Sequence, residues 1–261
     1  MVAVDMRLGE GVKMAESVRM LVSKLEVGDR TVIGENVVIR GKHVILGREC
    51  WIANGASIGG GSSDGSHATL VAGDFLHMGE GTHINIARRV ELGDEVGIGR
   101  GSRIYTHGAY LPETEGFPCA FEEVSIGNRV WLPMATVLPG VRIEDDVVVA
   151  AGSVVNHDLP RGCIAGGVPA KVIRDAVYPR RFTREVQWRN FIEKIAYETD
   201  LLLESADGGH VLKYGKTRFD LIAKTIVGPV TWETEKIKNQ LRRRGVRFRY
   251  RPGMGRRYVP W

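Results

Sequence analysis

Apolar residues recur every six positions along much of this chain, and this period constrains the fold more than any other feature. The series begins at Ile33, continues at Ile39 and Ile45, and runs with small slips to Val155. A step of six matches neither the roughly 3.6-residue period of a helix nor the alternation of a long strand. It fits a short strand and a corner, three of which make one coil with apolar residues stacked inward about 4.8 Å apart. Glycine, at 33 of 261 residues, supplies the positive φ that such corners need.

Two segments interrupt the period, at residues 59–73 and 107–123. An insertion at the corner of a solenoid costs little stability and often carries function. The first segment is rich in glycine and serine, which favours a flexible excursion. The second begins with His107 and contains apolar residues that could pack against a neighbouring subunit.

The most specific motifs of the chain follow the second interruption. They are IGNRVW at 126–131, VLPGV at 137–141, AAGSVV at 150–155 and AGGVPAKVI at 165–173. With the six-residue period, these motifs resemble the hexapeptide-repeat acyltransferases, in particular the galactoside, maltose and xenobiotic O-acetyltransferases. The resemblance covers about residues 27–175 and implies a mainly β fold, a left-handed parallel β-helix. A left-handed coil departs from the usual right-handed crossover.

The resemblance also implies an activity and an assembly. The enzyme would use acetyl-CoA as co-substrate, without a metal, and transfer an acetyl group to a hydroxyl of a saccharide or related small molecule. It would be a homotrimer, in which the loop at 107–123 helps to enclose the active site between adjacent subunits. A flat-sided prism offers good packing faces for such an assembly.

His107 is the predicted general base, because imidazole titrates near neutral pH and can take the hydroxyl proton as the oxygen attacks the thioester. The family places its catalytic histidine in this region. Maltose-type members have it five residues after the inward apolar residue, where this chain has Ala109, whereas His107 lies three after Ile104. The group that orients the imidazole is unassigned, with Glu122 and Glu123 as possibilities. Asn85 resembles a family asparagine near the acceptor hydroxyl and is the predicted substrate-binding residue.

Carried over from the family, the coenzyme A site comprises Met134, Ala151, Asn156, His157, Lys171 and Arg174. The small side chain of Ala151 would let pantetheine run along the coil, and Lys171 and Arg174 suit phosphates by charge. His157 stands where the family often has lysine. The spacing between Trp131 and Leu138 is one residue shorter than in the family, so the corner near Met134 differs.

Two other functions stay open: an N-acetyltransferase of an amino sugar, and a catalytically silent scaffold. A metal hydratase shares the coil but needs three suitably spaced histidines, and His77, His83 and His107 lack that spacing. The three cysteines are widely spread and form no CxxC pair, so neither a disulfide framework nor a zinc site is predicted. No apolar run approaches a membrane span of about 20 residues, and the first residues do not resemble a secretory signal. A cytoplasmic location is therefore expected.

The flanks of the repeat are predicted as separate elements. Apolar residues at helical spacing within 10–25 predict a short amphipathic helix, which would form an N-terminal cap over residues 1–26. Residues 176–261 lack the period and are predicted as an α+β extension of unknown role. The net charge of +5 is concentrated late in the chain and favours an anionic partner. Nucleotide phosphates and nucleic acid both qualify, and nucleic acid is less favoured because the aromatic residues would have to stack bases.

Overall fold

The computed structural model describes residues 5–261. The chain divides into two compact units, a repeat unit that ends at Pro179 and a C-terminal unit, Arg180–Trp261. Their hydrophobic cores share no residue, so each unit has an interior of its own.

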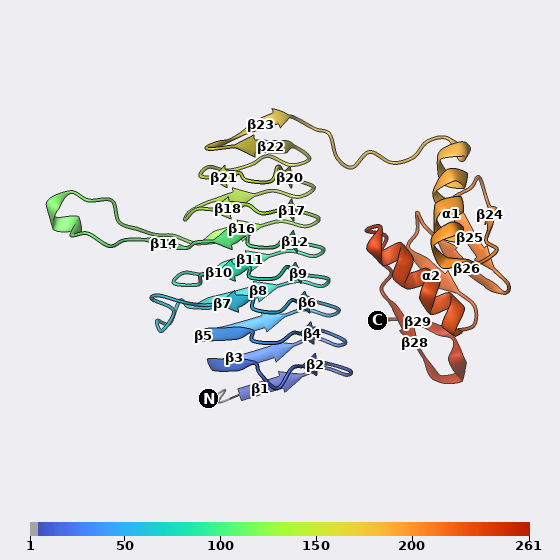
Figure 1. Cartoon of the computed structure of the whole chain (residues 1–261), viewed down its shortest axis with the longest axis horizontal. Coiled ribbons are helices and arrows are strands. Elements are labelled where there is room, and N and C mark those ends of the chain that lie inside the picture. Colours follow the sequence, from blue (N-terminus) through green and yellow to red (C-terminus); the bar gives the residue numbers. More distant parts are fainter. Residues whose placement is uncertain (1–4) are drawn as a thin grey trace. The chain divides into compact units, whose positions relative to one another are not determined.

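The repeat unit is a coil of short parallel strands, in which each strand pairs with its equivalent one coil away (Figure 1). The strands form three stacks. The first stack contains β2 (Lys13–Met14), β4 (Val32–Ile33), β6 (Trp51–Ile52), β9 (His77–Met78), β12 (Gly97–Ile98), β17 (Trp131–Leu132), β20 (Val148–Val149) and β22 (Ile164–Gly167). The final strand β23 (Ala170–Arg174) pairs antiparallel with β22 and ends the coil.

Two long strands, β3 (Arg19–Val27) and β5 (Val38–Leu46), take part in both of the other stacks. The second stack continues with β7 (Ser57–Ile58), β10 (His83–Ile84), β13 (Arg103–Ile104), β18 (Thr136–Val137) and β21 (Val154–Val155). The third contains β1 (Asp5–Leu8), β8 (Thr69–Ala72), β11 (Val90–Leu92), β16 (Val124–Ile126) and β19 (Arg142–Ile143). The repeat unit is therefore mainly β, with a curled parallel sheet.

The six-residue period corresponds to a ladder of buried side chains. In the second stack, Ile58, Ile84, Ile104, Val137 and Val155 lie in register in successive coils, and all are buried. Stacking apolar residues on one another removes each from water on both sides, which is the main stabilising contribution in such a coil.

Glycine is required at one corner because side chains of the next coil fill the space beside it. Asp94 Oδ1 accepts the backbone N–H of Asp74, and a Cβ added to Gly73 would lie 2.3 Å from that oxygen. The pattern repeats one coil later, where Asn128 Oδ1 accepts the N–H of Asp94. These side chains also satisfy backbone donors that the short strands leave unpaired.

The predicted N-terminal helix is wrong. Of the predicted cap, residues 1–4 lie outside the described residues, and the rest contains β1, β2 and β3, which form further coils. The helical spacing was misleading because β3 alternates as a strand does: Leu25 and Val27 are buried, whereas Leu21 is 49% exposed. Met14 and Met20 are six residues apart and pair with Ile33 and Ile39 of the next coil, so they continue the series after a one-residue slip, a signal that the helical interpretation overlooked.

The C-terminal unit has two helices, α1 (Glu185–Thr199) and α2 (Trp232–Arg243). Its antiparallel sheet contains β24 (Glu204–Ala206), β25 (Val211–Tyr214), β26 (Thr217–Asp220) and β27 (Thr225–Val227), followed by the pair β28 (Tyr250–Pro252) and β29 (Tyr258–Pro260). Phe219 and Phe248 pack edge to face in the core, with ring centroids 5.9 Å apart. Short 3-10 turns lie at Glu113–Glu115 and Met254–Arg256. No helix of the described chain is long and apolar enough to cross a membrane.

Candidate active site

Asn85 and His107 meet at one corner of the repeat unit. Asn85 directly follows β10, and His107 begins β14 (His107–Gly108), just after β13. Because Ile84 and Ile104 are paired in register, the residues that follow them lie one coil apart. His107 Nδ1 is 2.9 Å from Asn85 Oδ1. The structure thus places the two residues that the sequence singled out for catalysis and acceptor binding in direct contact.

The surroundings of Asn85 determine which nitrogen of His107 carries the proton. The buried carboxamide donates from Nδ2 to the Gly61 carbonyl oxygen at 3.0 Å, and its Oδ1 accepts the Ala87 N–H at 3.2 Å. Thr106 Oγ1 also donates to Oδ1, at 2.8 Å. With Oδ1 restricted to accepting, His107 Nδ1 must donate, and Nε2 keeps its lone pair. A neutral imidazole held in this tautomer is suited to accept a proton at Nε2.

The first interruption is part of this corner, and its last residues form a strand rather than the predicted excursion. Thr69–Ala72 is strand β8, and the Gly61 carbonyl fixes Asn85. A Cβ added to Gly61 would lie 3.6 Å from His107 Nε2, so the glycine keeps the Nε2 side of the imidazole uncrowded. The glycine run at 59–61 was the available sequence signal. It was hard to interpret because the contact is made by backbone rather than by a side chain.

His83 lies beside the same glycines. Its Nδ1 is 2.8 Å from Ser57 Oγ, and a Cβ added to Gly60 would be 3.1 Å from its Cε1. Burial lowers the pKa of His83, and its electrostatic interactions with Arg103 and His107 lower it further. His83 is therefore neutral at neutral pH and acts here as a hydrogen-bonding side chain.

One strand of the second interruption packs an aromatic ring against the imidazole of His107, and the rest of the segment extends away from the coil. β14 pairs antiparallel with β15 (Ala120–Phe121), which stacks the Phe121 ring on His107 with centroids 5.6 Å apart. The Arg88 guanidinium lies 5.0 Å from the centre of the Phe121 ring. Figure 1 shows the rest of this hairpin projecting from the coil, and Tyr110 near its tip is 97% exposed.

Asn85, and not a glutamate, is the side chain bonded to His107 Nδ1. Glu122 lies instead against the next coil, where a Cβ added to Gly140 would be 2.3 Å from its Oε2. This contact explains why glycine stands in the VLPGV motif: Gly140 has φ +81° and faces a carboxylate.

The six residues expected to bind coenzyme A lie in three pairs. Met134 and Ala151 share a corner of neighbouring coils, where the Gly152 N–H donates to the Met134 carbonyl at 2.9 Å. Both side chains are exposed. Met134 has φ +50°, a conformation that glycine adopts at the equivalent position of Gly152.

The other two pairs lie nearer the end of the coil. Asn156 directly follows β21, in the stack that carries Asn85, and its Oδ1 is 2.9 Å from Nδ1 of the exposed His157. Lys171 and Arg174 are exposed on β23. The last coils of the repeat unit thus offer a small side chain, amide groups and two cations along their outer surface.

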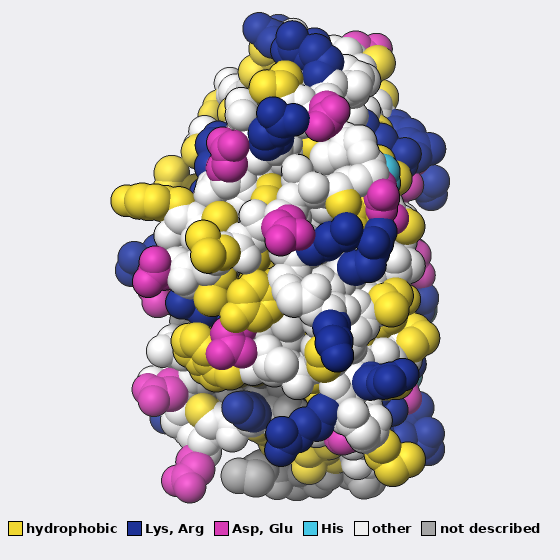
Figure 2. Space-filling model, turned by 90° about the vertical axis from the view of Figure 1, so that its right-hand side faces the viewer, with side chains coloured by type: hydrophobic (Ala, Val, Ile, Leu, Met, Phe, Trp, Pro, Cys, Tyr) yellow, Lys and Arg dark blue, Asp and Glu magenta, His cyan; other side chains and the backbone are white. Residues whose placement is uncertain are grey.

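Charge is divided unequally between the units. Residues 180–261 contain 19 of the 36 lysines and arginines but 9 of the 31 aspartates and glutamates, a net charge of +10 against −5 for residues 1–179. On the face drawn in Figure 2, basic side chains are spread among acidic and hydrophobic ones. No group of three histidine, cysteine, aspartate or glutamate side chains that could hold a metal occurs among residues 5–261.

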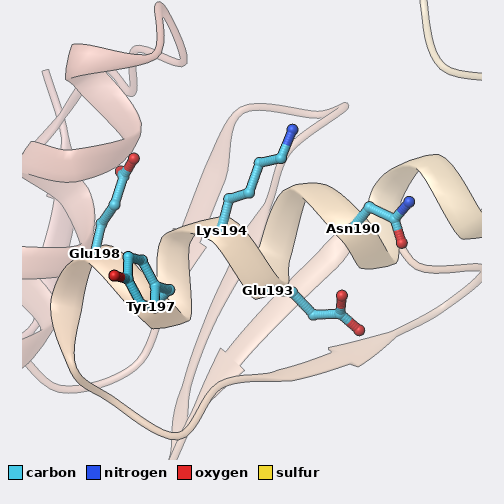
Figure 3. A pocket seen from close by; sticks show the side chains of 5 residues that line it. All are labelled: Asn190, Glu193, Lys194, Tyr197 and Glu198. Carbon is cyan, nitrogen blue, oxygen red and sulfur yellow. The ribbon is translucent and has the colours of Figure 1, made fainter.

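A hollow of about 500 Å³ lies along the outer surface of α1 (Figure 3). All of its lining residues come from this one helix: Asn190, Glu193, Lys194, Tyr197 and Glu198. Lys194 and Glu193 point to opposite sides of the helix, Glu198 pairs with Arg244, and Tyr197 is 89% exposed. The hollow contains no residue predicted for the site, and it offers no concentrated charge or enclosed apolar surface.

Comparison with known proteins finds the same repeat. The family model for the hexapeptide repeat of succinyl-transferase matches residues 24–59 and 123–157. Galactoside O-acetyltransferase of Escherichia coli is 47% identical over 53 residues, which is 20% of this chain and 26% of that protein. The putative acetyltransferase YvoF of Bacillus subtilis is 34% identical over 91 residues, 34% of this chain and 50% of that one. The matched regions thus span half or less of these relatives.

Among solved structures, the polysialic acid O-acetyltransferase OatWY aligns with a TM-score of 0.44 and 18% identity, over 69% of this chain and 93% of that one.

The fold and the corner define a parallel β-coil protein that holds a hydrogen-bonded histidine where a loop leaves the coil. With the closing motifs and the matched repeat, this chain is similar to the hexapeptide-repeat acyltransferases over the matched segments.

Proposed function

We propose that this chain is an acetyl-CoA-dependent O-acetyltransferase that acetylates a hydroxyl of a saccharide or related small molecule, with His107 as general base. The observation that carries the proposal is the 2.9 Å hydrogen bond from His107 Nδ1 to Asn85 Oδ1, which leaves Nε2 available to accept a proton. Relatives named galactoside O-acetyltransferase and putative lipopolysaccharide biosynthesis O-acetyl transferase support a sugar hydroxyl as acceptor.

The proposed reaction is a direct transfer. His107 Nε2 takes the proton of the acceptor hydroxyl while its oxygen attacks the acetyl carbonyl carbon. The bond from that carbon to sulfur breaks, and the thiolate of coenzyme A leaves with the proton returned by the imidazolium. Asn85 Oδ1 stabilises the imidazolium by accepting from Nδ1 throughout. Backbone N–H groups of a nearby coil would stabilise the oxyanion.

The same proposal assigns coenzyme A to the outer surface of the last coils of the repeat unit. Ala151 has a small, exposed side chain beside which pantetheine would run, next to Met134. Asn156 and His157 would contact the cofactor along the corner that continues from His107. Lys171 and Arg174 would bind its phosphates, because exposed cations suit phosphate oxygens.

We further infer a left-handed winding of the coil, a homotrimer and a cytoplasmic location, as the family resemblance implies. The hairpin that starts at His107 supports the assembly: Tyr110 and Leu111 are exposed apolar side chains on a segment that projects from the coil. Light scattering on the purified chain tests the assembly, and a monomeric mass would contradict a site completed by a second subunit.

The decisive experiment measures thiol release from acetyl-CoA across a panel of sugars and nucleotide sugars. We expect turnover by the wild type, its loss in His107→Ala with acetyl-CoA binding retained, and no change in His67→Ala, which alters an exposed histidine of the first loop. Activity that survives His107→Ala would contradict the assigned base. Acetylation of an amino group would favour the N-acetyltransferase alternative, and absence of acetyl-CoA binding would favour the silent scaffold.

A further inference from the structure

The C-terminal unit contains a pocket that the transferase proposal does not use. Its volume is about 310 Å³, close to the lower end of the range for small-molecule sites. Its lining combines apolar side chains with four cations. The apolar residues are Phe182, Trp188, Phe191, Leu221, Ile222 and Val246, and the cations are Arg180, Arg181, Lys224 and Arg244.

Aromatic contacts shape the apolar wall of the pocket. Trp188 and Phe191 lie on α1, and the Phe182 ring packs edge to face against Trp188 with centroids 5.0 Å apart. The Phe182 and Phe191 centroids are 6.2 Å apart. Because Phe182 is held by both rings, the two arginines immediately before it are kept at the edge of the pocket. Ile222 contributes an apolar side chain that is 49% exposed.

The charged side chains that line the pocket are all cations. None of the residues that line the pocket is acidic. Two carboxylates beside the pocket lie outside its lining: Glu198 pairs with Arg244, and Asp220 Oδ1 accepts the backbone N–H groups of Ile222 and Ala223. Arg180 and Arg181 are exposed at the rim. Cations beside low-dielectric aromatic surface attract an anion more strongly than the same charges on an open surface.

We infer that this pocket binds a small organic anion, with one phosphate or carboxylate group on an apolar body about the size of a fused ring pair. The apolar body would displace water from Trp188, Phe191 and Ile222. The anionic group would lie at the rim, within reach of Arg181 and Lys224. An inorganic ion would leave the apolar wall in contact with water, and a neutral aromatic would place no negative charge beside Arg180 and Arg181, so neither satisfies both halves of the site.

The test is calorimetric titration of the full-length protein with four probes: 1-naphthyl phosphate, 1-naphthoate, inorganic phosphate and 1-naphthol. We expect at least one of the two organic anions to bind about tenfold or more tightly than inorganic phosphate and 1-naphthol, and to weaken as salt is raised. The first two probes distinguish a phosphate from a carboxylate ligand. Equal binding of all four probes, or no binding of either organic anion, would overturn the inference.

Substitutions at the pocket test whether the organic anion binds there. The double variant Arg180→Gln/Arg181→Gln should weaken the organic anion about tenfold, and Ile222→Ser should weaken it while leaving inorganic phosphate unchanged. All three side chains are exposed, so these variants should fold. Lys216→Gln, which removes an exposed cation outside the pocket, is the matched control and should bind like wild type. If Lys216→Gln weakens binding as much as the arginine variant does, the affinity reflects the basic unit as a whole and the pocket assignment fails.

Discussion

Asn85 holds His107 through a single carboxamide oxygen, so the two side chains should act as one unit in catalysis. In Asn85→Leu the acceptor for Nδ1–H is lost and the imidazole is free to change tautomer and orientation. We expect kcat to fall by about 10²-fold, within the range contributed by a positioned general base, with the KM for acetyl-CoA unchanged. Steady-state kinetics checks this. A rise confined to the acceptor KM would show that Asn85 binds substrate and does not position the base.

The conservative variant Asn85→Asp separates positioning from packing. A carboxylate still accepts from Nδ1 but favours the imidazolium, so some activity should return and the acid limb of the pH–rate profile should move to higher pH. If Asn85→Asp is as inactive as Asn85→Leu and its profile is unshifted, the hydrogen bond is not what the reaction requires.

His83 should make the stability of the repeat unit depend on pH. Burial keeps the pKa of His83 in the folded protein below its usual value of about 6.5. As pH falls through and below that usual value, the unfolded chain binds the proton first, so stability is lost until the folded-state pKa is passed. Thermal denaturation between pH 7.5 and 5 should therefore show a smaller loss for His83→Gln than for wild type. His67→Gln, at an exposed histidine, should follow the wild type. A His83→Gln curve parallel to that of wild type would contradict the assignment.

The first coils offer a direct test of strand against helix, because the two structures assign Leu21 and Leu25 different environments. A helix would place both, four residues apart, on its buried face. In β3, Leu25 is fully buried and Leu21 is 49% exposed. We expect Leu25→Ala to destabilise the repeat unit by about 2–5 kcal/mol and Leu21→Ala by less than about 0.5 kcal/mol. Urea denaturation measures both, and comparable losses at the two positions would favour the helix.

The same elements show what the sequence could and could not predict. The inward ladder was predictable because positions such as Ile84 and Ile104 tolerate only apolar residues at a fixed step. The contact of Asn85 with His107 could not be read from the register alone, because Asn85 is level with Tyr105 and His107 lies two residues further on. The first coils were missed because β3 is one continuous strand that takes part in two stacks, which blurs the corner signal. The role of Gly61 was missed because a backbone carbonyl leaves no side-chain pattern.

The whole molecule should unfold in two steps, because its two hydrophobic cores share no residue. Buried surface gives cooperativity only within a continuous core, so each unit should have its own thermal transition. Calorimetry of the intact chain should show two transitions. Leu25→Ala should lower the midpoint of the repeat unit's transition only, and Phe219→Ala, at a buried ring of the C-terminal core, that of the C-terminal unit only.

The repeat unit also bears a net −5 charge and the C-terminal unit +10, so acidification should move their transitions differently. A single transition lowered by both variants would show that the units are energetically coupled. The C-terminal pocket would then have to be treated as part of the catalytic unit rather than as an independent binding site.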